Sequence, residues 1–382
     1  MSILALLGVA LAASLLLWHL DSLTPAWSAG ELATRSASSS LHAILNDPIN
    51  APFKLVVYGL IKIRPHSIMV VRLASALFGA LTIGLFFFIV RSWHSSRIAW
   101  LASLLLATST WFLHTARTGT PDVLLFGLLI LMALGLLMQR TRHRRLLVAI
   151  MAFSVAVAFY VPGIVWFLLF TAVWQRRVIR DSLYKIPRLV AAGSLAGFLL
   201  ILAPLAWAAS RNWHLIFAVF GLPEQLPKWL PVVKNLLDVP LNLFVRGPYL
   251  PGFWVGRTPV LDVFGTVLFV FGVYAYWQHR RLARFASLLS IFLLTDILVA
   301  LGGPVTLSLL LPFVYLVIAT GLAFLLGEWL SVFPRNPLAR GFGLAIVTLA
   351  VLLSCTYQLD RYFIAWPRQP ATKQAFAGQL VL

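Results

Sequence analysis

The sequence predicts an all-α polytopic membrane protein, a bundle of about 11 transmembrane helices with interfacial helices in the first external loop. The chain of 382 residues is 61% hydrophobic and only 11% charged, whereas soluble domains carry roughly 25% charged residues. Its mean hydropathy is +0.92. The apolar residues also gather in long runs, and so much apolar surface cannot be buried in one soluble core.

The predicted spans follow from run length, because crossing about 30 Å of hydrocarbon takes about 20 apolar residues. Residues 2–20 are interpreted as a spanning helix rather than a signal peptide, since neither a basic n-region nor a clear Ala-x-Ala site accompanies them. Pro162-Gly163 shortens two neighbouring segments, which suits a tight hairpin or a kinked helix with a re-entrant piece. The segments lie near residues 2–20, 67–90, 98–114, 122–138, 146–161, 163–175, 189–209, 259–277, 285–301, 304–326 and 341–358.

The distribution of positive charge predicts the orientation. The net charge is +19, and about half of the 30 Lys and Arg residues lie in five short loops that alternate with less basic ones. The positive-inside rule places these five loops in the cytoplasm and explains the charge better than nucleic-acid binding does. The N-terminus is then cytoplasmic, and we expect a bacterial inner membrane. The basic loops are 91–97, 140–145, 175–188, 278–284 and 327–340.

The external side is the predicted working face. It receives the two largest loops, 21–66 and 210–258, and most of the acidic residues. The expected organisation is one transmembrane domain over residues 1–358 and a short external tail over 359–382. Prolines are dense in loop 210–258, so we expect turns rather than long helices there. That loop is either a mobile lid over a site or an inert connector.

The first external loop predicts two short helices. Ser28 and Glu31 have capping-box spacing, which predicts a helix from about residue 29 to 45. Its apolar residues fall largely on one side, as in a helix that lies in the membrane interface. A second helix is expected over about 52–63, with two lysines on one face that suit either snorkelling to headgroups or contact with a lipid phosphate. That face carries Lys54, Tyr58 and Lys62.

A second acidic motif follows the third apolar segment. Thr120 is a suitable N-cap, Pro121 suits the first helical position, and Asp122 falls in the first turn, where the helix dipole favours a carboxylate. Asp122 and Glu31 therefore both have an ordinary role as helix-end acids. His114, just upstream, is expected to hydrogen-bond locally rather than bind a metal, because no second ligand stands at helical spacing.

Both acids also have a functional interpretation. A charge near hydrocarbon depth costs roughly 3 kcal/mol, and such residues usually mark a site. Glu31 and Asp122 share the predicted external side, and Arg117 lies close to Asp122 in sequence. Two carboxylates beside a cation could deprotonate a hydroxyl next to an anionic phosphate.

Four stretches in order carry a resemblance to a known family. They are the acidic first loop ending in Asp47-Pro48…Pro52, then Arg72-Leu-Ala-Ser-Ala-Leu-Phe-Gly79, then Leu105-Leu-Ala-Thr-Ser109…Ala116-Arg117-Thr-Gly-Thr-Pro-Asp122, and finally Tyr362-Phe-Ile-Ala-Trp-Pro367. With them the chain resembles the GT-C superfamily, closest to the protein O-mannosyltransferase and aminoarabinose transferase branch. Relatives usually show two adjacent acids in the first loop, whereas Gly30 precedes Glu31 here.

The resemblance implies a glycosyltransferase that takes sugar from a polyprenyl-phosphate donor on the external face and inverts the anomeric centre. The acceptor would be a glycan, a lipid or a protein. Glu31 would be the catalytic base and Asp122 the second acid. Some GT-C enzymes use a divalent ion, which these two carboxylates could share, although the sequence has no dedicated metal motif. The candidates for holding the donor phosphate are Lys54, Arg72, Arg117, Arg246 and Arg257.

Two other functions stay open at this point. A lipid or solute transporter, or a flippase, would predict an internal repeat and polar groups near the bilayer midplane. No repeat is visible, and Asp296 is the only acid clearly inside a predicted span. A non-catalytic membrane subunit that keeps the GT-C fold is the third possibility.

Overall fold

The computed structural model describes residues 3–24, 26–65, 67–140, 144–183, 186–250 and 252–377, and within these ranges every regular element is helical. In chain order the elements are α1 (Ile3–Leu17), α2 (Ala29–Ala37), α3 (Leu41–Asn46), α4 (Ala51–Ile63), α5 (Ile68–Trp93), α6 (Ser96–Thr108), α7 (Thr110–Arg117), η1 (Pro121–Gly127), α8 (Leu128–Arg140), α9 (Arg144–Ala158), α10 (Ile164–Trp174), α11 (Arg176–Leu183), α12 (Arg188–Arg211), α13 (His214–Val219), α14 (Trp229–Phe244), α15 (Val263–Gln278), α16 (Ala283–Ala300), η2 (Leu307–Leu310), α17 (Leu311–Val332), α18 (Pro337–Asp360), the π-helical turn η3 (Arg361–Ala365), α19 (Trp366–Arg368) and α20 (Pro370–Ala377).

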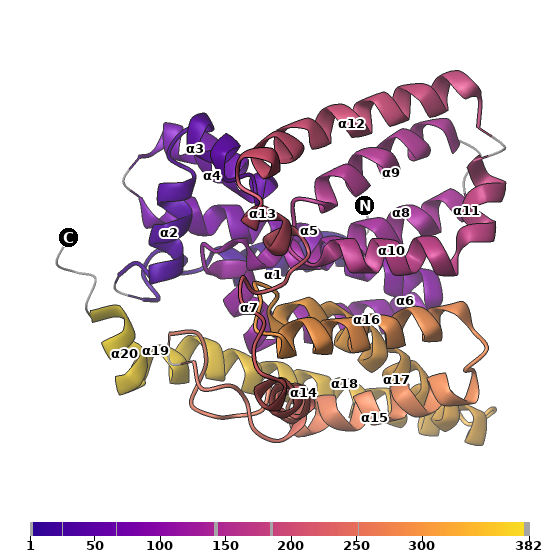
Figure 1. Cartoon of the computed structure of the whole chain (residues 1–382). Coiled ribbons are helices and arrows are strands. Elements are labelled where there is room, and N and C mark those ends of the chain that lie inside the picture. The colour runs from indigo at the N-terminus through magenta and orange to yellow at the C-terminus, as the bar shows by residue number, and fades with distance from the viewer. Residues whose placement is uncertain are drawn as a thin grey trace.

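The long helices form one bundle (Figure 1). Helices α9 and α12 pack together along one edge, and α15, α17 and α18 pack along the other. Helices α2, α3 and α4 gather at one end of the bundle together with α19 and α20, while α11 lies at the opposite end. Most of the first predicted external loop and the end of the chain thus lie at one end, which holds the candidate site, whereas α14 packs on α16.

The predicted fold class is confirmed. Among the described residues, six helices are long and apolar enough to cross a membrane, or seven if α6 and α7 form one broken span bent by 65°. Each of the predicted apolar segments coincides with a helix or with a bent pair of helices. The chain is a multi-pass membrane protein, and a count of about 11 crossings remains a prediction.

Two expectations for the loops were wrong in detail. The helix predicted over residues 29–45 is two helices, α2 and α3, because Ser40 leaves the helix and caps α3 by accepting a hydrogen bond from the Ala43 N–H at 3.1 Å. Loop 210–258 contains the 16-residue helix α14. Pro231 lies in its first turn, where a backbone N–H has no intrahelical partner anyway, so proline is tolerated there.

The centre of the bundle depends on close contact between α15 and α17. In the most apolar 18-residue stretch of η2–α17, 78% of the residues are buried inside the protein. Gly272 on α15 and Gly321 on α17 lie at the contact, where an added Cβ would overlap the carbonyl oxygens of Val317 and Leu268 respectively. Small residues allow the two backbones to approach, as is common between membrane helices.

We therefore expect Gly321→Ala to destabilise the protein by about 1–3 kcal/mol, because the methyl group overpacks the α15–α17 contact. The measurement is thermal unfolding of purified protein in detergent. Gly327→Ala on the same helix is the control, since a Cβ there meets nothing within 4 Å and alanine favours a helix by about 0.5–1 kcal/mol. Equal stabilisation by both substitutions would contradict the packing described here.

Candidate functional site

Glu31 is held at the start of α2 by a capping box. The Glu31 N–H donates to the Ser28 hydroxyl at 3.2 Å, and the Ser28 N–H donates to the Glu31 carboxylate at 2.8 Å. This geometry confirms the predicted box. Glu31 is also deeply buried, with only 1% of its surface exposed. A carboxylate at that depth needs a cationic partner.

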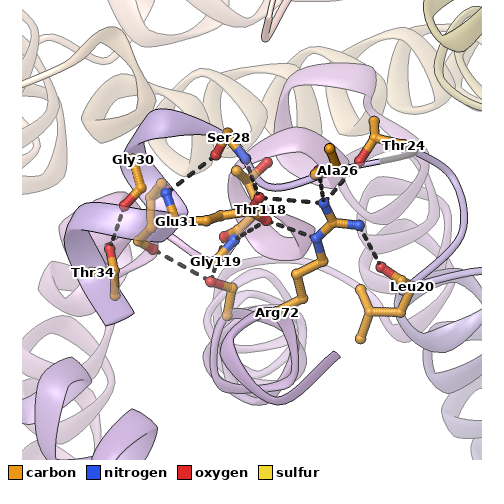
Figure 2. Close-up of polar contacts among 12 residues, drawn as sticks. Leu20, Thr24, Ala26, Ser28, Gly30, Glu31, Thr34, Arg72, Thr118 and Gly119 are labelled. Atoms are coloured by element: carbon orange, nitrogen blue, oxygen red, sulfur yellow. Dashed lines mark hydrogen bonds and ion pairs between the residues drawn. The ribbon is translucent and has the colours of Figure 1, made fainter. Parts of the chain in front are cut away.

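That partner is Arg72, which lies on α5 and is itself buried. Its Nε donates to one oxygen of Glu31 at 2.7 Å and its Nη2 to the other at 3.3 Å, so the ion pair is bidentate. The guanidinium also donates to the Leu20 carbonyl at 3.0 Å and to the Thr24 hydroxyl at 2.8 Å (Figure 2). One side chain thus fastens α2 and the segment before it to a long helix of the bundle.

All the hydrogen-bonding capacity of the Glu31 carboxylate is in use. One oxygen accepts from Arg72 and from the Gly119 N–H at 3.2 Å, and the other accepts from Arg72 and the Ser28 N–H. An ionised carboxylate has about four lone-pair sites. Glu31 can therefore accept a proton only after one of these bonds breaks.

Arg117 is a second buried cation beside this pair. At the end of α7 it is 3% exposed, and its guanidinium donates to the carbonyls of Leu15 and Trp18. The guanidinium carbon also lies 5.3 Å from the centroid of the Tyr362 ring and 4.9 Å from that of Phe363. Among the described residues, Arg117 belongs to no ion pair and its Nε has no hydrogen-bond partner.

A small polar cavity brings three of the sequence-predicted site residues together, namely Glu31, Arg72 and Arg117. Its volume is about 20 Å³, about the room that one water molecule needs. Half of the remaining wall comes from neighbouring segments of the sequence and half from residues 252–376. It is lined by Leu20, Leu23, Thr24, Thr118, Gly252, Tyr362, Trp366 and Phe376.

His114 lies behind this wall in an aromatic cage. Its ring centroid is 4.4 Å from that of Trp366, 4.7 Å from Tyr362 and 4.8 Å from Phe253. In the part of the chain that the structure describes, neither ring nitrogen has a hydrogen-bond partner, and neither does Trp366 Nε1. The expectation of a local hydrogen bond for His114 was therefore wrong, because aromatic rings from distant segments surround the imidazole.

Asp122 lies close to the cavity by chain connectivity. It stands three residues after Gly119, whose N–H contacts Glu31, so the two backbones at 119 and 122 are roughly 11 Å apart at most. Thr120 and Pro121 begin η1 as predicted, although the turn is 3₁₀ and Thr120 makes no capping bond through its side chain. Within the described residues, the partly exposed Asp122 carboxylate has neither a hydrogen bond nor an ion pair.

The other predicted phosphate ligands lie outside the cavity. Lys54 is buried but donates to the carboxylate and the carbonyl of Asp47, both at 2.7 Å. Arg246 and Arg257 are exposed on the loop after α14, where the Arg257 guanidinium lies 5.5 Å from the Tyr249 ring. Geometry thus favours Arg72 and Arg117 over these three cations as residues near the reacting groups.

An apolar groove adjoins the same region. Its volume is about 140 Å³, and it runs between α4, α5, η1–α8 and α9–α10. Segment 118–127 connects the two spaces, because Thr118 lines the polar cavity while Val123, Leu124 and Phe126 line the groove. Asp122 stands between them in the sequence.

Comparison with known proteins agrees with this architecture. Residues 53–207 match the family model of dolichyl-phosphate-mannose-protein mannosyltransferases. The fold matches apo ArnT from Cupriavidus metallidurans with a TM-score of 0.55 at 16% identity, over 98% of this chain and 77% of ArnT. The chain has the GT-C fold. The resemblance inferred from the four sequence stretches is thereby confirmed.

Two further structures share the GT-C fold. ArnT bound to undecaprenyl phosphate matches with a TM-score of 0.51 at 15% identity, over 99% of this chain and 77% of that one. The archaeal oligosaccharyltransferase AglB from Archaeoglobus fulgidus, in complex with an inhibitory peptide and a dolichol-phosphate, matches with a TM-score of 0.55 at 15% identity, over 97% and 56% respectively. No curated protein matches the sequence.

The donor set around Glu31 does not fit the divalent ion that the resemblance left open. Both carboxylate oxygens contact the Arg72 guanidinium, so a metal ion would have to displace a cation that is already well placed. Among the residues the structure describes, no group of three or more His, Cys, Asp or Glu side chains could hold a metal ion.

Glu31→Gln should lower stability by about 3–5 kcal/mol, because glutamine can keep the capping box but leaves the Arg72 charge buried and unpaired. Thermal unfolding in detergent measures this. Adding Arg72→Gln should recover part of the loss. The control is Asp181→Asn, because Asp181 and its ion-pair partner Arg180 are both exposed, at 64% and 66%, and the expected loss is at most about 1 kcal/mol. Similar Tm values for Glu31→Gln and the wild type would contradict a structural ion pair.

Proposed function

We propose that the chain is a glycosyltransferase that transfers a sugar from a polyprenyl-phosphate donor to an acceptor on the external face, with inversion at the anomeric carbon. One observation carries the proposal. Segment 118–127 lies between a cation-lined polar cavity and an apolar groove. A prenyl-phosphate sugar has the matching chemistry, since a long apolar chain is joined to an anionic headgroup.

The match with the GT-C fold supports the choice of donor. One ArnT structure is described as bound to undecaprenyl phosphate and the AglB structure as in complex with a dolichol-phosphate. In this chain the groove would take the first isoprene units, because its walls are almost entirely apolar. The phosphate would then reach Arg117, a buried guanidinium whose Nε is unpartnered among the described residues and which can stabilise negative charge.

We assign proton abstraction to Asp122. The family resemblance gives the role of base to Glu31, but all four lone-pair sites of Glu31 are occupied. Asp122 can accept a proton without breaking a hydrogen bond. Glu31 then acts as a positioning residue that holds Arg72 and the turn at Gly119.

The proposed reaction uses the donor, the acceptor hydroxyl, Asp122 and Arg117. The acceptor hydroxyl attacks C1 of the sugar from the side opposite the phosphate, the C1–O bond to phosphate breaks, and the hydroxyl proton passes to Asp122. Polyprenyl phosphate leaves as an anion, so no acid has to protonate it. The charge that develops on its oxygens is stabilised by Arg117. Attack from the opposite side gives inversion.

The direct test is to incubate purified, reconstituted protein with radiolabelled polyprenyl-phosphate sugars and candidate acceptors. Transfer of label to an acceptor is the expected result. Movement of the lipid across vesicles without transfer would point instead to a transporter. Absence of both across the donor panel would contradict the proposed activity and favour a non-catalytic subunit.

Asp122→Asn should lower kcat by about 10²–10⁴, the usual contribution of a general base, while Tm stays unchanged because the carboxylate makes no hydrogen bond within the described structure. Asp238→Asn on α14 is the control, since Asp238 lines neither the cavity nor the groove. Full activity of Asp122→Asn would remove the assignment of the base.

Gly127→Leu should raise KM for a long-chain donor about tenfold with little change in kcat, because the new side chain projects into the apolar groove. A Cβ at Gly127 meets nothing within 4 Å, so the backbone tolerates it. Gly135→Leu is the matched control, because position 135 is equally open but lies outside the groove. Equal KM values for the two variants would argue against donor binding in this groove.

A further inference from the structure

The polar cavity is too small for the substrates of the proposed function. It has a volume of about 20 Å³, whereas pockets for small-molecule ligands usually have roughly 300 Å³ or more. A sugar headgroup can reach Arg117 only if one wall of the cavity moves. The walls differ greatly in how they are held.

Two walls are pinned to the bundle by charged hydrogen bonds. Glu31 and Arg72 form a buried bidentate pair, which also holds Thr24 and the Leu20 carbonyl. Arg117 is bound to carbonyls of the first helix and the turn after it. Moving either wall would expose or unpair a buried charge, so these walls are the least able to open.

The third wall is the short helix α20 (Pro370–Ala377). Its Phe376 lines the cavity and packs with Ala26, Val255 and Trp366 in a small apolar cluster. The contact that Phe376 makes in this cluster is between apolar side chains, and α20 packs mainly on α19. Thr372 on the same helix is buried, at 1% exposed, and is not without a partner. Figure 1 shows α20 at the end of the bundle beside α19, away from the long helices.

A break between two helices precedes α20. Gln369 is extended, with φ −65° and ψ 134°, between α19 and Pro370. Proline disfavours helical geometry in the residue before it, so this break is fixed by the sequence. Rotation at Gln369 would lift Phe376 from the cavity and leave Trp366 in place.

Behind α20, Trp366 lines the cavity, and His114, which does not line it, packs against the Trp366 ring. Trp366 Nε1 and both ring nitrogens of His114 are buried without partners in the described part of the chain. Their rings are 4.4 Å apart, centroid to centroid. A bound sugar offers hydroxyl groups for such donors and a C–H face for the aromatic rings.

We propose that α20 is a gate over the candidate site. It closes when Phe376 seats against Ala26, Val255 and Trp366, and it swings at Gln369 to admit the sugar-phosphate headgroup, which then contacts Trp366. This inference rests on the proposed function for the identity of the ligand. The movement itself is independent of that identity.

A disulfide can lock the gate shut. An ideal Cβ at Gly252 would lie 3.7 Å from the Cβ of Ala375, within the 3.5–4.5 Å that disulfides adopt. The loop at Gly252 is itself anchored, because the next residues, Phe253 and Trp254, pack on Trp111 with ring centroids 5.0 and 4.8 Å apart. Gly252→Cys with Ala375→Cys therefore ties α20 to a fixed point.

The first arm of the test measures sugar transfer by this double variant in a Cys355→Ala background, which removes the native thiol. Oxidation should reduce transfer at least tenfold, and reduction should restore it to the level of the same double variant before oxidation. Each single cysteine variant should be insensitive to oxidant. An oxidised, cross-linked protein with background activity would overturn the gate, and inactivity of the background itself would count against the proposed function.

The second arm needs no turnover and decides on the gate by itself. Leu20→Cys, also in the Cys355→Ala background, places a thiol on the cavity wall at a position that is 3% exposed. Its labelling by a charged, water-soluble thiol reagent should be slow, and adding Phe376→Ala should speed it at least tenfold by weakening the closed state. An unchanged labelling rate would overturn the gate, whether or not the protein transfers sugar.

Discussion

The buried ion pair between Glu31 and Arg72 sets the geometry of the whole site, because neither charge can remain at this depth without the other. The pair joins α2 to α5 and, through the Gly119 N–H, to the turn that leads to Asp122. The first loop is thereby fastened to the long helices of the bundle rather than lying free at the membrane surface. The proposed proton transfer and the proposed opening at α20 both depend on this pair holding α2 against α5.

With Glu31 held in the ion pair, the two acids have different proposed roles. Glu31 gives up its lone pairs to hold cations and backbone N–H groups in place, so its contribution is positional. Asp122 makes no such bonds within the described structure and can exchange a proton. The proposed opening at α20 follows the same logic, because the Phe376 contact is apolar whereas the other two walls carry buried charges.

Local sequence patterns predicted most of the helices, but they predicted only part of the candidate site. Run length predicted the helices, and the spacing of Ser28 and Glu31 predicted the capping box. The partnership of Glu31 with Arg72 spans 41 residues, so no local pattern could show it. The same holds for His114, whose aromatic neighbours come from loop 245–262 and the end of the chain. The string from Tyr362 to Pro367 was visible in the sequence, but its place in the cavity wall depends on tertiary packing.

The most direct test is a cryo-EM structure of the protein in lipid nanodiscs with undecaprenyl phosphate. We expect density for isoprene units between α5 and η1–α8, a phosphate in contact with Arg117, and Glu31 still paired with Arg72. A headgroup bound at the α11 end of the bundle, or one beside Arg246 and Arg257 with the cavity unoccupied, would contradict the account.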